Sequence, residues 1–182
     1  MASLNNIQQV LQAKIQRSIS GLPVVLVNEA VTWTKQNFRR QGWPGAGFTP
    51  WKQRKANSRR NAGRGILIDS GRLSRSPRMI RISGLRGEFG TDVPYASAHN
   101  NGFIGTVNVK SHKRNKIGTV KVSTGKAGQQ FKTKKTITGV GNVKAHQRRM
   151  NLPRRRFIGY SPVLHSILRK KAIVHLGREL KK

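Results

Sequence analysis

Positive charge dominates this sequence, because 37 lysine and arginine residues stand against only 5 aspartate and glutamate residues, for a formal net charge of +32. Such a chain repels itself as it compacts, so it needs an apolar core, an anionic partner, or both. Leu, Ile, Val and Phe make up about a quarter of the 182 residues, above the roughly 20% below which highly charged chains stay disordered. We therefore expect a single domain over residues 1–182 and a large anionic partner, either nucleic acid or an acidic protein surface.

Several classes of protein are excluded or disfavoured. The sequence has no cysteine, which excludes disulfides, cysteine zinc sites and thiol catalysis. No apolar run approaches the roughly 18 residues that span a bilayer, and residues 1–12 lack the basic start and apolar stretch of a signal peptide. We expect a protein made and used in the cytoplasm or in an assembly, without a membrane partner.

Apolar residues spaced by three and four predict helices at both ends of the chain. The spacing over residues 3–20 is that of one helix face, and Gly21 is expected to end this helix. A second helix is predicted over Pro23–Arg40, because proline is tolerated in a first turn and arginines suit a helix end. These two helices are expected to lie antiparallel. The pair Ser161–Pro162 predicts the cap and first turn of a final helix.

Glycine and proline interrupt the pattern over residues 42–65, which predicts a long loop. Trp43 and Trp51 flank its Gly/Pro-rich part, and we interpret both as core residues that anchor it. Residues 66–68 are apolar again, and residues 69–71 form an Asp-Ser-Gly turn or helix cap.

A β-hairpin is predicted over residues 78–91. Ile80 and Ile82 have the two-residue period of one strand face, with the intervening arginine on the other face. Residues 84–87 form the turn candidate, and residues 88–91 the returning strand.

The segment 105–150 is basic, with 12 lysines and arginines and no acidic residue. Three short strands are predicted in it, over residues 106–110, 118–123 and 136–140. A charge run of this kind is usually solvated unless a partner covers it. Its candidate contacts with DNA or an acidic partner are Lys110, Lys113, Arg114, Lys116, Lys132, Lys134, Lys135, Arg148 and Arg149.

Acidic residues are too few for most carboxylate or metal chemistry. Asp69, Glu88 and Asp92 could meet as a magnesium site of a nuclease, but we favour ordinary roles. In that interpretation Asp69 caps a turn and the other two pair with neighbouring arginines. We predict no cofactor and no metal, and we expect the protein not to be an enzyme.

Other catalytic motifs are weak or absent. The run His99-Asn100-Asn101 superficially resembles His-Asn-His endonucleases, but the remaining histidines supply no ligands at workable spacing. We interpret His99 as a packed or hydrogen-bonded histidine beside Tyr95. No serine-nucleophile motif and no phosphate-binding loop occurs in the sequence.

Aromatic residues interleaved with the cations allow a second interpretation, nucleic-acid binding by phosphate contacts and base stacking. They are Trp43, Trp51, Phe103, Phe131 and Phe157. The competing interpretation places the aromatics in the core and leaves the cations solvated. A charge of +32 exceeds the magnitude of roughly 2 to 8 that solubility asks of a small domain, so an electrostatic function is expected.

Several segments, taken in order, resemble the tailed-phage virion morphogenesis proteins, which include tail-completion and head-tail joining proteins of Mu-like phages. They are Trp51 after the Gly/Pro loop, residues 66–76, residues 90–96 with His99 and Gly102, and residues 153–159. The resemblance covers about residues 36 to 165, and it depends on several motifs in the same order. The motif residues are Trp51, Ser70, Gly71, Leu73, Tyr95, Ala96, His99, Gly102, Pro153, Arg155, Phe157 and Gly159.

This resemblance implies an α+β fold, with a small antiparallel sheet packed against the N-terminal and C-terminal helices. It also implies a ring subunit, a hexamer by the sixfold geometry of tails, that contacts neck, connector and tail-tube proteins. The expected location is the head-tail interface or tail end of the virion, with assembly in the host cytoplasm. Tyr95 and Phe157 are expected to pack under the sheet as scaffold residues, while Arg155 pairs or hydrogen-bonds nearby.

The basic segment 105–150 departs from the family pattern, so its contacts are not implied by the resemblance. We expect a long basic β-rich insertion that meets DNA in the channel or acidic surfaces of neighbouring virion proteins. The alternatives are a DNA- or RNA-binding module of genome packaging or a ribonucleoprotein, which the charge supports, and a nuclease, which Asp69 and Asp92 would serve.

Overall fold

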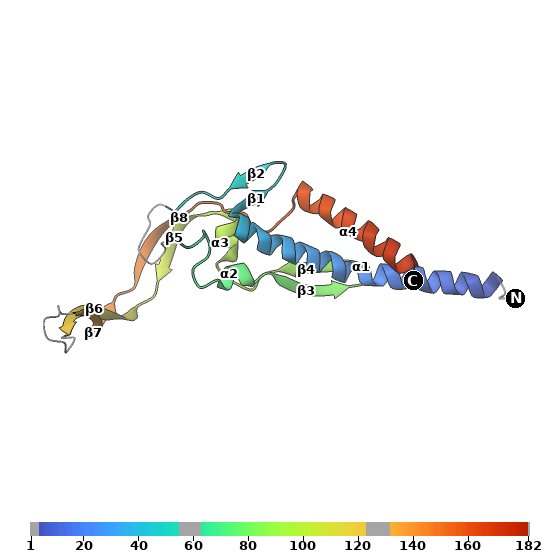
Figure 1. Ribbon diagram of the computed structural model, residues 1–182. Coiled ribbons are helices and arrows are strands. Elements are labelled where there is room, and N and C mark those ends of the chain that lie inside the picture. The colour runs from blue at the N-terminus through green and yellow to red at the C-terminus, as the bar shows by residue number, and fades with distance from the viewer. Residues whose placement is uncertain (1–3, 55–62, 123–131, 182) are drawn as a thin grey trace. The chain divides into compact units, whose positions relative to one another are not determined.

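The computed structural model describes residues 4–54, 63–122 and 132–181, and its description excludes the side chains of residues 4, 5, 132 and 133. Helices and antiparallel strand pairs both occur, which confirms the predicted α+β fold (Figure 1). The chain forms two compact units, residues 1–103 with 152–182 and residues 104–151. The elements are α1 (Leu4–Arg40), β1 (Gly42–Pro44), β2 (Phe48–Pro50), α2 (Arg72–Arg75), β3 (Arg78–Ser83), β4 (Arg86–Gly90), α3 (Ala96–Asn101), β5 (Phe103–Val109), β6 (His112–Val122), β7 (Lys132–Val143), β8 (His146–Leu152) and α4 (Pro162–Lys181).

One continuous helix of 37 residues, α1, replaces the two predicted antiparallel helices, so that prediction is wrong. Gly21 and the buried Pro23 lie inside it. A proline inside a helix costs about 3 kcal/mol, because its ring clashes and its missing N–H leaves a carbonyl unpaired. Packing on both sides holds this stretch helical, since a Cβ on Gly21 would lie 3.5 Å from the His175 ring, and one on Gly87 would lie 3.4 Å from the Pro23 carbonyl oxygen. Tertiary contacts therefore outweigh the local tendency of Gly21 and Pro23 to end the helix.

The antiparallel partner of α1 is α4, from the other end of the chain (Figure 1). The Ser161 hydroxyl accepts a hydrogen bond of 3.3 Å from the Leu164 N–H, which confirms the predicted cap. Leu164 packs in a cluster with Trp33, and further along α4 the Lys171 ammonium pairs with the Glu29 carboxylate at 2.9 Å. None of the described helices has the length and apolar character needed to cross a membrane.

Both tryptophans of the predicted loop are buried, which confirms their role as anchors. The loop begins with the small antiparallel hairpin β1–β2. The ring of Trp43 meets Trp33 of α1 edge to face at 5.1 Å between centroids, and Trp51 meets Phe38 in the same way at 5.5 Å. Edge-to-face pairs add to the stabilisation that burial provides, so the irregular segment is fixed to α1 at two points.

The predicted hairpin over residues 78–91 is present as β3–β4, joined by the two-residue turn Gly84–Leu85. A β-bulge between Met79 and Arg81 shifts the register, which breaks the two-residue period on which the prediction depended. Ile80 is consequently 61% exposed, while Met79 and Ile82 are half-buried. The expectation that Ile80 and Ile82 share one inward face is therefore wrong.

A second core lies where the end of α1 meets α2, α3 and the segment before α4. The short helix α2 follows the predicted turn at residues 69–71, and α3 follows Tyr95. Each contributes one buried apolar side chain, Leu73 from α2 and Ala96 from α3. The buried residues of this core are Phe38, Trp51, Ile66, Leu73, Val93, Ala96 and Phe157.

The described residues of 104–151 form two strand pairs: β5 pairs with β8, and β6 pairs antiparallel with β7. The predicted strand over 106–110 falls on β5 except for Lys110, and that over 136–140 falls on β7. The predicted strand over 118–123 falls on β6 except for Ser123, which lies outside the described residues. Strand β8 was not predicted. Its first four residues are polar and exposed, and only Met150 and Leu152 alternate with an exposed residue, a pattern too short to predict a strand.

Candidate functional site

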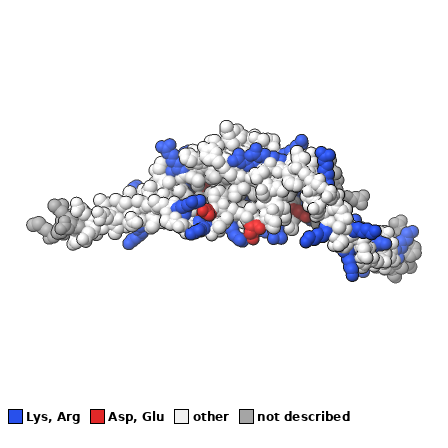
Figure 2. Space-filling view, turned by 180° about the vertical axis from the view of Figure 1, so that it is seen from behind, with Lys and Arg blue, Asp and Glu red and all other residues white. Residues whose placement is uncertain are grey.

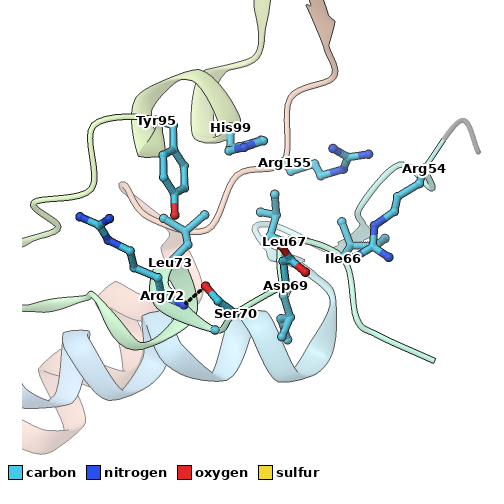
Figure 3. Close-up of a pocket in the computed structure, with 12 residues that line it drawn as sticks. Arg54, Ile66, Leu67, Asp69, Ser70, Arg72, Leu73, Tyr95, His99 and Arg155 are labelled. Carbon is cyan, nitrogen blue, oxygen red and sulfur yellow. Dashed lines mark hydrogen bonds between the residues drawn. The ribbon is translucent and has the colours of Figure 1, made fainter. Parts of the chain in front are cut away.

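A pocket of about 490 Å³ collects residues of the family motifs from three distant segments (Figure 3). Ser70, Gly71 and Leu73 come from the turn into α2, Tyr95 and His99 from α3 and the residue before it, and Arg155 from the segment before α4. The full lining is Arg54, Ile66, Leu67, Ile68, Asp69, Ser70, Gly71, Arg72, Leu73, Tyr95, His99 and Arg155.

The turn before α2 forms one wall of the pocket. Gly71 has φ of 78°, in the left-handed region that glycine tolerates best. The Ser70 hydroxyl accepts a hydrogen bond of 3.4 Å from the Arg72 N–H, and the Ser70 carbonyl accepts one of 2.8 Å from the Arg75 guanidinium. This turn directs Leu73 into the core, where it is buried. The motif residues Ser70, Gly71 and Leu73 therefore shape the backbone here.

Arg155 joins three segments of the chain. Its Nε donates to the Lys52 carbonyl oxygen at 2.9 Å, and its Nη2 donates to the Gln53 carbonyl oxygen at 3.3 Å. Its backbone N–H donates to the His99 carbonyl oxygen at 2.9 Å. The predicted hydrogen bonding of Arg155 is thus present, and the fork geometry of the guanidinium serves it.

His99 lies between Tyr95 and Arg155 at the pocket wall (Figure 3). Its ring meets the Tyr95 ring edge to face at 5.9 Å, as the interpretation of a packed histidine predicts. Its Nδ1 is buried and has no hydrogen-bond partner among the described residues. Burial, and then the nearby Arg155 charge, lower the pKa of His99, so its ring is neutral at neutral pH. Burial, and then Arg54, also lower the pKa of Arg155.

Tyr95 departs from its prediction, because its side chain is 44% exposed and does not pack under a sheet. It directly precedes α3, where Val93 and Ala96 take the buried positions and leave the Tyr95 ring at the rim. Phe157 is 0% exposed, but it packs against Phe38 of α1, with 5.0 Å between ring centroids. Phe157 is therefore buried as predicted, but it packs against a helix and not under the sheet.

The remaining motif residues hold neighbouring segments together. Trp51 donates from Nε1 to the Arg156 carbonyl oxygen at 2.7 Å. Gly102 and Gly159 have φ of 80° and 135°, where a side chain would strain the backbone. A Cβ on Gly102 would also lie 3.2 Å from the Arg154 nitrogen, while Pro153 is half-buried beside them.

Two asparagines of this region were not predicted from the sequence. The Asn100 carboxamide oxygen accepts hydrogen bonds from the Phe157 and Ile158 N–H groups, at 3.0 and 3.1 Å. Asn37 is fully buried on the inward face of α1, four residues after Trp33. The sequence did contain a signal for Asn37, because it is a polar residue among the apolar positions of one helix face. Buried polar groups need hydrogen-bond partners, so such a residue indicates a buried hydrogen bond.

The acidic residues do not converge. Asp69 pairs with Arg64 at 2.6 Å, Glu88 with Arg86 at 3.2 Å, and Asp92 with Arg78 at 3.4 Å. This confirms the arginine pairing expected for Glu88 and Asp92, and Asp69 likewise pairs with an arginine. Over residues 4–54, 63–122 and 132–181 no group of three or more His, Asp or Glu could hold a metal ion.

The predicted cationic contacts lie elsewhere, on or beside the strands of residues 104–151. All have exposed side chains except Lys132, whose side chain is outside the description. Of the interleaved aromatics, Trp43, Trp51 and Phe157 are buried, which favours the core interpretation, while Phe131 lies outside the described residues.

A comparison with protein families agrees with the resemblance seen in the sequence. Residues 2–176 match the phage virion morphogenesis family. A comparison with curated proteins returned no match, and a comparison with solved structures returned none either. The family match extends over almost the whole chain, including both ends of the fold and the strands of residues 104–151. The chain therefore belongs to the phage virion morphogenesis family.

Proposed function

We propose that this protein is a non-enzymatic ring subunit that completes the tail of a phage virion or joins it to the head at the neck. Its family membership supports a structural role in virion assembly. In this proposal six copies form the ring, as the sixfold geometry of tails suggests. Neighbouring neck, connector and tail-tube proteins contact it, and the basic segment faces genomic DNA in the channel or acidic neighbours.

The observation that carries the proposal is the N-terminal part of α1, which continues beyond the end of α4 (Figure 1). Ile7, Val10, Leu11 and Ile15 are exposed on one face of this extension. Figure 2 shows few charged side chains over it. Most of the stability of a helix comes from packing of its apolar face, and this part of α1 leaves that face exposed to water. A neighbouring subunit would cover this face and stabilise the helix.

The first test compares two double variants of the full chain. Ile7→Ser with Leu11→Ser removes two apolar side chains from the exposed face, whereas Gln9→Ser with Gln16→Ser changes the other side of the same helix. Light scattering at high salt, which screens self-repulsion, should give a ring for the wild type and the glutamine variant but a monomer for the apolar variant. A ring that survives in the apolar variant would contradict this role of α1.

The second test supplies variants of this protein to a phage whose own gene for it has been deleted, and it measures the assembly of virions. Deleting residues 110–149 should preserve folding of residues 1–103 with 152–182 but abolish incorporation into virions. Normal infectious particles from this deletion would overturn the proposal.

A nucleic-acid-binding module remains the second candidate, favoured by the net charge of +32 and the exposed cations. Such a module would coat DNA or RNA as an isolated monomer, and its affinity would fall steeply with salt. A ring subunit would instead assemble without nucleic acid, so light scattering with and without duplex DNA separates the two.

A further inference from the structure

The hairpin β6–β7 has two different faces. Residues paired across an antiparallel ribbon point to the same side, and successive pairs alternate. Arg114 pairs with Gly141 and Lys116 with Gly139, so two cations of β6 face glycines of β7. The register shifts between Lys116 and Ile117, which leaves Thr138 of β7 between two pairs. Beyond the shift, the Gly118–Thr136 and Val120–Lys134 pairs continue this side. We call it the glycine face, and its residues are Arg114, Lys116, Gly118, Val120, Lys134, Thr136, Gly139 and Gly141.

The glycine face is open at Gly139 and covered by side chains at its other two glycines. The Thr138 side chain occupies the position that a Cβ on Gly118 would take. The Lys116 chain crosses Gly141, where an added Cβ would lie 3.1 Å from the Lys116 Cε. Around Gly139, no described atom lies within 4 Å of the position of an added Cβ. Arg114, Lys116 and Gly141 also line a groove of about 540 Å³, whose wall includes Asn115, Ile117 and Asn142 from the other side of the ribbon. An extended ligand can therefore approach the backbone of β7 closely while Arg114 and Lys116 flank it.

Charge and spacing on this face suit a polyphosphate. The described residues of the hairpin include no acidic residue, and Arg114, Lys116 and Lys134 are all exposed. Side chains two residues apart on a strand lie about 6.8 Å apart, which equals the rise of two nucleotides, about 3.4 Å each, along the axis of duplex DNA. The major groove of DNA is also wide enough for a two-stranded ribbon.

Other partners fit this face less well. Lysine is depleted in the centre of protein–protein interfaces, which argues against an acidic protein as its main partner. Single-stranded nucleic acid is bound largely by stacking on aromatic side chains, and the described residues of β6 and β7 contain no Phe, Tyr or Trp and one histidine, His112. The apolar pair Ile117–Ile137, 67% and 64% exposed, lies on the opposite face.

We propose that the glycine face of the β6–β7 hairpin binds the phosphate backbone of duplex DNA without reading its base sequence. The biological setting rests on the proposed function, in which this segment faces channel DNA. The binding itself is a property of the full chain in solution, so it can be tested apart from virion assembly.

The test uses two triple variants of the full chain that each remove three exposed charges from the same hairpin. The glycine-face variant carries Arg114→Gln, Lys116→Gln and Lys134→Gln. The matched control changes cations that the register places on the opposite face: Lys113→Gln, Lys121→Gln and Lys135→Gln. Equal circular dichroism and thermal midpoints establish that both variants fold as the wild type does.

Binding to a labelled duplex is measured by fluorescence anisotropy over a salt series, with two duplexes of unrelated sequence. The glycine-face variant should bind at least about tenfold more weakly. Its slope of log K against log salt should fall in magnitude by about 2 to 3, near 0.9 for each phosphate that the variant no longer neutralises. The control should bind less than about threefold more weakly than the wild type, and both duplexes should bind equally.

Several outcomes would overturn the inference. Equal weakening in both triple variants would mean that the charge acts diffusely and that the face does not matter. Tighter binding of the wild type to polyglutamate or to single-stranded DNA than to the duplex would assign the hairpin to one of those partners. A failed ring experiment with the α1 variants would count against the proposed function and would leave this binding result unaffected.

Discussion

The side-chain amide of Asn37 donates a hydrogen bond of 3.1 Å to the carbonyl oxygen of Phe157, across 120 positions of the chain. Both residues are 0% exposed, so water cannot replace the bond. Asn37→Ala should lower the free energy of unfolding by about 1–3 kcal/mol, because the Phe157 carbonyl is left buried without a donor. Chemical denaturation measures this change. Asn28→Ala, on the exposed side of the same helix, should stay within about 0.5 kcal/mol of the wild type.

Arg155→Lys should destabilise the protein although the charge is kept. Lysine has no planar fork, so it cannot donate to the Lys52 and Gln53 carbonyl oxygens in the geometry of Arg155. We expect the free energy of unfolding, measured by denaturant titration, to fall by about 1–3 kcal/mol. The neighbouring Arg154 is exposed, and Arg154→Lys should be nearly neutral. Equal stability of the two variants would show that charge alone is what Arg155 contributes.

Stability should decrease in acid because of His99. Burial and Arg155 lower the folded-state pKa of His99 from its ordinary 6.5, so the unfolded chain takes up the proton at a higher pH than the folded chain. The stability that neutral His99 contributes to the folded state is fully present above the unfolded-state pKa. It is lost as the pH falls through the folded-state pKa. Thermal midpoints of wild type and His99→Gln, compared from pH 7.5 to 4.5, should differ in slope below about pH 6.5. Parallel pH profiles would contradict this assignment.

Two glycine-to-alanine substitutions should act in opposite directions. A Cβ on Gly87 would lie 2.4 Å from Val27 Cγ2 and 3.1 Å from Ile82 Cδ1, so Gly87→Ala should separate β4 from α1 and cost about 1–3 kcal/mol. Around Gly177 in α4, no described atom lies within 4 Å of an added Cβ. Gly177→Ala should stabilise the helix by about 0.5–1 kcal/mol. Thermal midpoints that move in the same direction for both variants would refute the close approach at Gly87.

Local chemistry accounts for the elements that were predicted well. Ser161 before Pro162 is a cap whose hydrogen bonds lie within one turn, so neighbouring residues decide it. The hairpin β3–β4 has its turn at Gly84 for a similar reason, since its φ of 54° suits glycine. Local patterns gave wrong predictions where distant segments intervene, as at Pro23, and where a bulge changes the period, as at Ile80.

In the candidate site, too, local sequence predicted some features and distant contacts decided others. Their order along the chain was sufficient to predict the family, because each motif is a short run of residue types. That Ser70, Tyr95, His99 and Arg155 surround one pocket, and that Asn37 and Asn100 hold the segment before α4, could not be predicted. These contacts join residues tens of positions apart, and no spacing rule relates such residues.

The sequence by itself determined the charge, the helix and strand periods of most elements, and the family, because these depend on residue types and their near neighbours. Only the tertiary structure decided that α1 runs unbroken through Pro23, since packing against α4 and β4 offsets the cost of the proline. It likewise decided which cations of β6 share a face with glycine. That assignment depends on the register with β7, which pairing across the hairpin sets and composition does not.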